Sequence, residues 1–147
     1  MADMDARDGR RPSPLKLVHD EGRAPTRAPT RDAQVERAIA LMRAEPEARW
    51  TVTRLARRVG LSRPAFARRF HAGTGTSPMR YLCAVRMQRA AALLRETSHG
   101  LPQVAEAVGY TSEFAFNRAF KRHHHLPPGS YRRAAMESAR PAFRCAA

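Results

Sequence analysis

The sequence contains one short pattern twice, about fifty residues apart. The first copy is VGLSRPAFARRFHA, residues 59–72, and the second is VGYTSEFAFNRAFKR, residues 108–122. In each copy a glycine follows an apolar run, and two phenylalanines further on enclose an arginine. Phenylalanines at i and i+4 share one face of a helix, and glycine suits the left-handed turn that ends the preceding helix. Each copy therefore predicts two helices joined by a tight turn, a helix-turn-helix.

The agreement between the two copies extends beyond these residues. Positions before the turn match at an offset of 49, and positions after it match at 50, because the second turn has one extra residue. The matching pairs are Leu55/Val104, Ala56/Ala105, Val59/Val108, Gly60/Gly109, Ser62/Thr111, Phe66/Phe116, Arg68/Arg118, Phe70/Phe120, Pro78/Pro128 and Tyr81/Tyr131. The chain therefore carries a duplicated structural unit.

Further helices are predicted around the duplication. Apolar residues at i, i+3, i+4 and i+7 predict a helix that begins near Val35 and ends at Pro46. Ser77-Pro78 opens a long helix between the copies, with serine as the cap and proline at the first helical position. A short last helix follows at 128–133. We therefore predict an all-α fold of about seven helices over residues 32–134, in which a long central helix joins two helix-turn-helix subdomains.

The two ends of the chain have a different composition. Residues 1–31 hold four prolines among charged residues and show no sustained apolar periodicity. Such a composition buries too little apolar surface to offset the loss of chain entropy, so we predict a disordered tail there and a second one over 135–147.

Positive charge is concentrated on the part that is predicted to fold. The whole chain has 27 basic and 13 acidic side chains. Residues 1–31 are nearly balanced, with seven basic and five acidic side chains, whereas residues 32–134 carry eighteen against seven. This excess favours a polyanionic partner, either a nucleic acid or an anionic membrane surface.

Apolar runs, the N-terminal sequence and the cysteine count indicate where in the cell the protein works. No apolar run approaches the roughly 20 residues that span a bilayer, and the first thirty residues lack the apolar stretch of a secretory signal. Cys83 and Cys145 are too few for a disulfide framework, and we expect them to be unpaired. We therefore predict a cytoplasmic protein without a membrane partner.

The arginines between the phenylalanines are placed to contact a nucleic acid. Arg68 lies about 180° around the helix from Phe66 and Phe70, and Arg118 has the same place in the second copy. Arginine can contact guanine and asparagine can contact adenine through two hydrogen bonds in the major groove. The alternative for any single arginine is a solvated charge. The candidate DNA-contacting residues are Arg63, Pro64, Ala67, Arg68 and His71 in the first copy, and Glu113, Phe114, Asn117, Arg118, Lys121 and Arg122 in the second.

These segments resemble a known family. LARRVGLSRPAFARRFHAGTGTSPMRYL, RMQRAAALLRET and VAEAVGYTSEFAFNRAFKRHHHLPPGSYRR are similar to the DNA-binding domain of AraC/XylS-type transcription regulators. The resemblance covers residues 32–134. It implies a sequence-specific regulator whose two recognition helices enter successive major grooves on one face of the DNA, about 34 Å apart. It also implies double-stranded DNA and RNA polymerase as partners, and an association with the nucleoid.

Three departures from the family pattern affect these expectations. His125 stands where the family usually has glycine, and histidine adopts the left-handed conformation less readily. Pro64 and Ala67 offer little hydrogen bonding, so we expect the first copy to bind more through the DNA backbone and the second to specify more. Only a predicted tail precedes the domain, which is typical of members that act as monomers on asymmetric sites, and we expect regulation through protein abundance.

The sequence gives little indication of metal binding or catalysis. His123, His124 and His125 are consecutive, so on a helix they point about 100° apart and do not converge on one metal ion. Cys83 is expected to pack rather than react. No catalytic arrangement or phosphate-binding glycine loop is found, so we predict no enzyme, metal or cofactor. Two alternatives to a sequence-specific regulator stay open: a non-specific architectural DNA binder, and the DNA-binding half of an alkyl-transfer repair protein.

Overall fold

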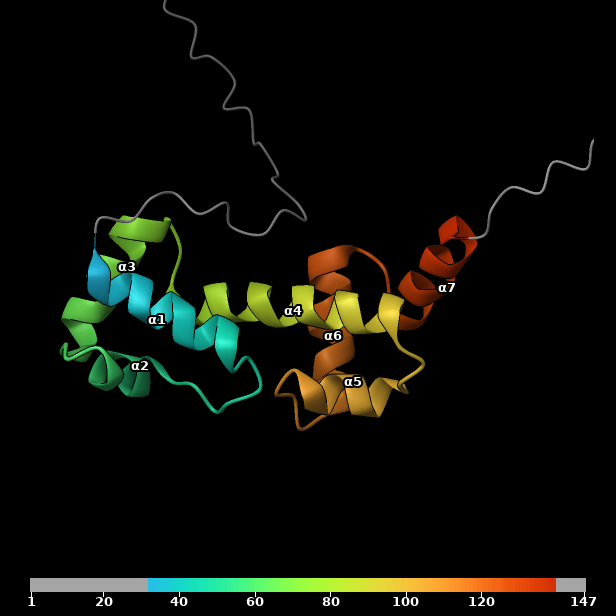
Figure 1. Cartoon of the computed structure of the whole chain (residues 1–147), viewed down its shortest axis with the longest axis horizontal. Coiled ribbons are helices and arrows are strands. Elements are labelled where there is room, and N and C mark those ends of the chain that lie inside the picture. The colour runs from blue at the N-terminus through green and yellow to red at the C-terminus, as the bar shows by residue number, and fades with distance from the viewer. Residues whose placement is uncertain (1–31, 140–147) are drawn as a thin grey trace, which may run out of the picture.

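The computed structural model describes residues 32–139, and this part of the chain contains seven helices and no strand (Figure 1). The predicted all-α fold is therefore confirmed. The helices are α1 (Ala33–Ala44), α2 (Val52–Arg58), α3 (Arg63–Thr74), α4 (Pro78–Glu96), α5 (Leu101–Ala107), α6 (Glu113–His124) and α7 (Pro128–Ala139).

The helix ends follow from the local sequence. The hydroxyls of Ser62 and Ser77 accept hydrogen bonds from the free amides at the starts of α3 and α4, as N-cap residues do. Gly75 ends α3 with φ of 74°, in the left-handed conformation. His125 ends α6 in the same conformation, with φ of 61°. The substitution of histidine for glycine thus leaves the last turn intact, at the cost of a strained residue.

The apolar side chains form two separate cores, one for each unit. In the first unit, α1, α2, α3 and the start of α4 enclose Phe66 and Phe70. In the second unit, the rest of α4 packs with α5 and α6 around Phe116 and Phe120. All four phenylalanines have no exposed surface. The prediction that each pair marks the buried face of its helix is confirmed.

The central helix serves both units. Its first turn carries Tyr81, whose ring meets the Phe70 ring edge-on at 5.5 Å between centroids. Tyr131 on α7 meets Phe120 in the same way at 5.3 Å. The start of α4 therefore closes the first unit as α7 closes the second, and the remainder of α4 is the first helix of the second unit. This sharing sets the two units side by side along one helix (Figure 1).

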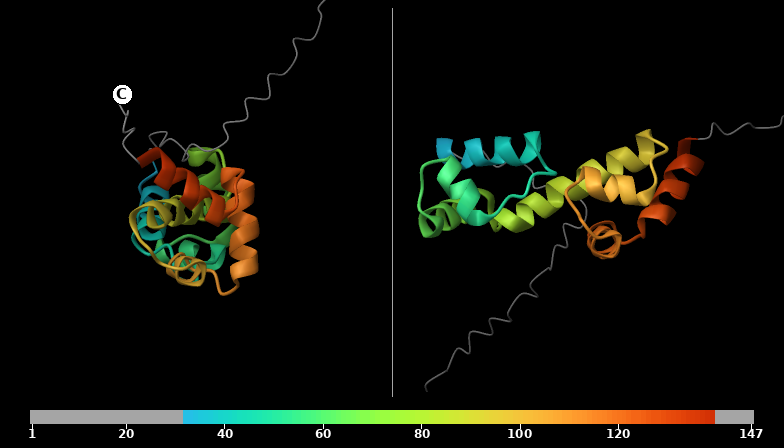
Figure 2. Two further views of the ribbon diagram at one scale, coloured as in Figure 1. Left: turned by 90° about the vertical axis from the view of Figure 1, so that its right-hand side faces the viewer. Right: turned by 90° about the horizontal axis from the view of Figure 1, so that it is seen from below.

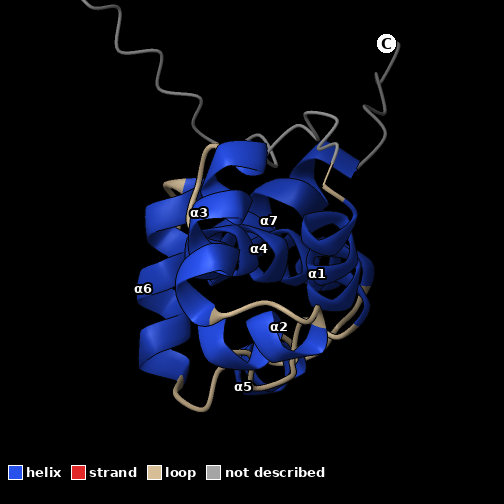
Figure 3. Ribbon diagram, turned by 90° about the vertical axis from the view of Figure 1, so that its left-hand side faces the viewer, coloured by secondary structure: helices blue, strands red, loops and turns tan. Residues whose placement is uncertain are grey.

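The second helix of each helix-turn-helix, α3 in the first copy and α6 in the second, lies on the same side of α4. Viewed along α4, α3 and α6 lie to its left and α1 lies to its right (Figure 3). The view from below agrees, with α1 along one edge of the molecule and α6 on the opposite one (Figure 2). The duplication thus brings two equivalent helices to one face of the molecule.

The last helix is longer than predicted. The sequence predicts its end near residue 133 and a disordered tail over 135–147, but α7 continues to Ala139. Residues 134–139 are mostly exposed, so they show none of the apolar periodicity on which the prediction relied. They are nevertheless good helix formers, and no proline interrupts them before Pro141. The predicted tail over 1–31, residues 140–147 and Cys145 lie outside the described residues.

Candidate nucleic-acid interface

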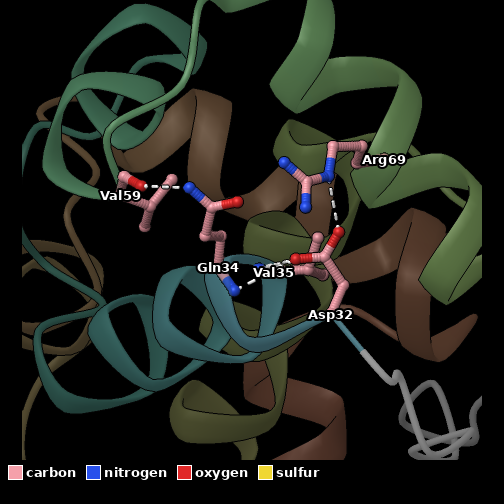
Figure 4. Close-up of polar contacts among 5 residues, drawn as sticks. All are labelled: Asp32, Gln34, Val35, Val59 and Arg69. Atoms are coloured by element: carbon pink, nitrogen blue, oxygen red, sulfur yellow. Dashed lines mark hydrogen bonds and ion pairs between the residues drawn. The ribbon is translucent and has the colours of Figure 1, made fainter.

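Two polar contacts from the start of α1 hold α3 and the end of α2 in place. The Arg69 guanidinium on α3 donates a hydrogen bond to the Asp32 carboxylate, with 2.7 Å between Nε and Oδ2 (Figure 4). The other Asp32 oxygen caps α1 by accepting from the Gln34 and Val35 amides. The Gln34 side chain then donates to the Val59 carbonyl at 2.9 Å, just before the turn into α3. One end of α1 therefore fixes where α3 begins and how it is oriented.

The charge state of Asp32 depends on these contacts. Slight burial by itself raises the pKa of the carboxyl. The hydrogen bonds from Arg69 and from the Val35 and Gln34 amides outweigh that effect, so the pKa of Asp32 lies below its usual value. Asp32 is therefore a carboxylate at neutral pH and well below it, and it stays paired with Arg69.

The predicted contact residues of α3 lie on its exposed side. Arg63, Pro64, Arg68 and His71 are exposed, and Ala67 is half-buried. Their exposure follows from the burial of the phenylalanine pair on the opposite side of the helix. The helix therefore presents two guanidinium groups and an imidazole to solvent. Pro64 and Ala67, on the same side, have no side-chain hydrogen-bond donor.

On α6, an exposed aromatic ring accompanies the arginine. Phe114, the second residue of α6, is 71% exposed although it is large and apolar. The Arg118 guanidinium lies 5.7 Å from the centre of its ring, within cation–π distance. Glu113, Lys121 and Arg122 are also exposed. The ring contact restrains the Arg118 side chain, so a charged group stands in a defined position at the surface of α6.

Asn117 lies deeper than the exposed arginine beside it. The residue is half-buried, and its Oδ1 atom is out of contact with solvent and has no hydrogen-bond partner. It lines a cavity of about 440 Å³ between α6 and the start of α7, together with Phe114, Arg118, Pro128 and Arg133. An unpaired buried acceptor is unfavourable.

A second hollow separates the two units on the side of α6. It has a volume of about 710 Å³ and is lined by the α3–α4 turn, by Arg80 on α4 and by Arg122 and His123 on α6. The Nε2 atom of His123 is buried without a hydrogen-bond partner. Burial lowers the pKa of His123, and the neighbouring His124 and His125 lower it further. Arg80 and Arg122 are exposed and leave positive charge at the edge of this hollow.

The run of three histidines has a packing role at its centre. The His124 ring stacks on Phe120, with 4.4 Å between centroids, and its Nε2 lies 3.2 Å from the Met87 carbonyl on α4. Burial lowers the pKa of His124, which favours the neutral ring. Within residues 32–139, no group of three histidine, cysteine, aspartate or glutamate side chains is arranged to hold a metal ion.

Comparison with known proteins identifies the fold. The family model described as "Helix-turn-helix domain" matches residues 55–134, more than half of the chain. An AraC-like transcription regulator of Streptomyces lividans is 41% identical over 102 residues, which cover 69% of this chain and 34% of that protein. This chain belongs to the AraC-type helix-turn-helix family. The resemblance based on the duplicated motif is therefore confirmed.

Solved structures agree with the AraC-type assignment. The chain matches an AraC-type regulator from Chromobacterium violaceum with a TM-score of 0.67 and 30% identity, over 74% of this chain and 94% of that one. It matches the DNA-binding domain of AdpA, solved in complex with a target DNA, with a TM-score of 0.71 and 28% identity, over 74% of this chain and 97% of that one. The chain spans about a third of the length of the curated relatives it matches.

Some residues of this AraC-type domain carry a role that the sequence pattern does not reveal. Arg80 and Arg133 line the two hollows beside α6, and Asp32 with Arg69 orients α3. These partners are far apart in sequence, so no local spacing marks them.

None of the helices in the described part of the chain combines the length and apolarity that a bilayer crossing needs.

Proposed function

We propose that this chain is a sequence-specific DNA-binding transcription regulator that inserts α3 and α6 into successive major grooves. The observation that carries the proposal is the pairing of two equivalent helices on one side of α4. Each buries its two phenylalanines and presents an arginine to solvent (Figure 3). The major groove is wide enough to admit a helix, and successive grooves on one face of the duplex are about 34 Å apart.

Charge supports DNA as the partner. Residues 32–139 carry eighteen basic and eight acidic side chains. Arg80 and Arg122 at the edges of the hollow between the units are suited to the phosphates that pass between the two grooves. Such contacts position a protein on DNA, whereas base contacts specify the sequence. The likeness to the AdpA domain, which was solved with a target DNA, supports the same conclusion.

The duplication also supports binding as a monomer. One chain supplies two recognition helices, so two adjacent grooves are contacted without a second copy of the protein. The two helices present different side chains, with Pro64 and Ala67 on α3 matching Phe114 and Asn117 on α6. A monomer of this kind reads an asymmetric site. In this role the protein works on the nucleoid in the cytoplasm, and RNA polymerase is the partner through which transcription changes.

The test contrasts two cations on α6. Arg118, opposite the buried phenylalanines, is assigned to base edges, so Arg118→Ala should cost about 1–3 kcal/mol on the preferred site and relax the preference at one or two base pairs. Arg122, nearer the hollow, is assigned to phosphate. Arg122→Ala should weaken binding to all sequences nearly equally and reduce the slope of log affinity against log salt by about 0.9.

The measurement is a salt titration of both variants on the preferred site and on scrambled DNA of the same length. Both substitutions remove one positive charge from the same helix, so each is a control for the other. If Arg118→Ala weakens binding to the two DNAs equally, α6 grips DNA without reading it. The architectural alternative would then replace the proposed function.

A further inference from the structure

A half-buried arginine joins the two units at a point away from both recognition helices. Arg86 lies in the middle of α4, and its guanidinium donates two hydrogen bonds to the loop between α1 and α2. Its Nε lies 2.7 Å from the Pro46 carbonyl oxygen, and Nη2 lies 2.9 Å from that of Ala48. Arg86 lies where the second core begins, because the next residue, Met87, is the first buried residue of that core on α4. The second unit therefore holds a loop of the first.

The same guanidinium contacts the turn of the second unit. Its carbon lies 5.8 Å from the centre of the Tyr110 ring, between α5 and α6. That ring packs edge-on against Phe116 at 5.9 Å, and the Tyr110 hydroxyl lies 3.7 Å from the Cys83 sulfur. Arg86 is thus enclosed between a loop of the first unit and the turn that sets the start of α6.

The turn and the loop also meet directly at Gly109. A Cβ atom on this residue would lie 2.8 Å from the Glu47 carbonyl oxygen and 2.9 Å from Arg86 Nη2. Gly60, its counterpart in the first copy, has a similar φ, 72° against 82°, but open space around it. Glycine at 109 therefore meets a requirement beyond the turn conformation, which is the close approach of the two units.

We infer that Arg86, Gly109 and Tyr110, together with the loop 45–49, form an inter-unit clamp that fixes the spacing at which α3 and α6 meet DNA. The main helix packings lie within one unit or the other, with α4 as the shared helix. A single helix bends gently along its length. A second connection, off the α4 axis, restrains the bending and twisting of one unit relative to the other. This inference rests on the proposed function.

The consequence for DNA is a strict spacing between the two recognised segments. One inserted base pair moves the second segment along the duplex by about 3.4 Å and rotates it by about 34°. A rigid pair of units cannot follow that displacement without losing one set of contacts. A pair joined by α4 alone can follow part of it. The clamp is therefore a determinant of specificity that touches no base.

The first experiment measures affinity of the full chain for sites with zero or one base pair inserted between the segments. We expect the wild type to lose at least about tenfold on the longer site. Arg86→Met keeps the aliphatic stem but removes the hydrogen bonds and the charge, and it should lose less than about threefold on the longer site relative to its own affinity for the native one. Arg89→Met removes a charge from an exposed position on the same helix and should behave as the wild type. Equal spacing penalties for Arg86→Met and the wild type would overturn the inference.

A second variant pair tests the clamp without substituting Arg86 itself. Gly109→Ala and Gly60→Ala impose the same left-handed strain, but only Gly109→Ala drives a side chain into the first unit. Gly109→Ala should relax the spacing preference, and Gly60→Ala should keep it. If the two variants tolerate the longer site equally, the close approach at Gly109 does not set the spacing.

The final measurement needs no DNA. Spin labels are attached at Arg57→Cys on α2 and Gln103→Cys on α5, in a chain in which Cys83 and Cys145 are replaced by alanine. The distance distribution between the labels should be narrow with Arg86 present and broader with Arg86→Met. An unchanged width would contradict the clamp. Loss of all sequence preference by the wild type, with the broadening still observed, would instead overturn the proposed function and leave the clamp standing.

Discussion

Inserting four residues into α4 between Val85 and Arg86 is expected to lower the affinity for the two-segment site by at least about 10²-fold. Four helical residues lengthen α4 by about 6 Å and rotate the second unit by about 40° beyond a full turn. The buried residues of the first core end at Leu82 on this helix, and those of the second begin at Met87, so each core keeps its own residues. The insertion also separates Arg86 from the 45–49 loop and Cys83 from Tyr110, so the second unit is free to take its new position relative to the first. The relation between α3 and α6 changes, and with it the simultaneous fit to two grooves.

This expectation is checked by titrating the insertion variant on the two-segment site and on DNA that carries either segment alone. Binding to single segments should be almost unchanged, because each unit is intact. Circular dichroism provides the control for folding. Undiminished affinity and an unchanged footprint length on the full site would exclude the model in which both helices contact DNA together.

Phe120→Ala is expected to lower the free energy of unfolding by about 3–5 kcal/mol. The ring has no exposed surface and contacts the rings of Phe116, His124 and Tyr131, with centroids 5.7, 4.4 and 5.3 Å away. Its removal leaves a cavity that three rings from two helices cannot fill together. Domains of this size are stable by only about 5–15 kcal/mol, so the variant loses much of its stability.

Phe114→Ala supplies the matched control, because it is the same substitution on the same helix. Phe114 is 71% exposed, so its removal should change the unfolding free energy by no more than about 0.5 kcal/mol. Urea denaturation followed by circular dichroism measures both variants. Similar losses from the two substitutions would mean that α6 does not bury the face assigned to it.

Phe114→Ala should weaken DNA binding although it leaves stability unchanged, because the Phe114 ring restrains Arg118.

Much of the fold could be predicted from the sequence because its determinants are local. The phenylalanine pairs fix the buried faces of α3 and α6, and the Ser77-Pro78 pair fixes the start of α4, within a few residues along the chain. The duplication supports each of these predictions, since a turn residue in one copy has a counterpart at the matching position of the other. The exposed positions of Arg68 and Arg118 follow from the same geometry.

Other features depend on contacts between distant residues, which a pattern along the chain does not record. Arg86 has an ordinary place on an amphipathic helix, and only the fold brings the 45–49 loop to its guanidinium. The partial burial of Asn117 depends on where α7 begins. Residues 135–139 extend α7 without burying an apolar face, so the criterion that located the other helices could not detect them.

Selection of bound sequences from random DNA shows whether one chain reads two adjacent grooves. The full chain is incubated with a random duplex library at fixed salt, and the bound DNA is sequenced after several rounds. We expect two enriched segments whose centres are about 10–10.5 base pairs apart, different from each other and without two-fold symmetry. Selection with Arg118→Ala should lose enrichment within one segment only. A library with no enrichment, with a single short segment, or with a palindrome would contradict the proposal that one chain reads two adjacent grooves.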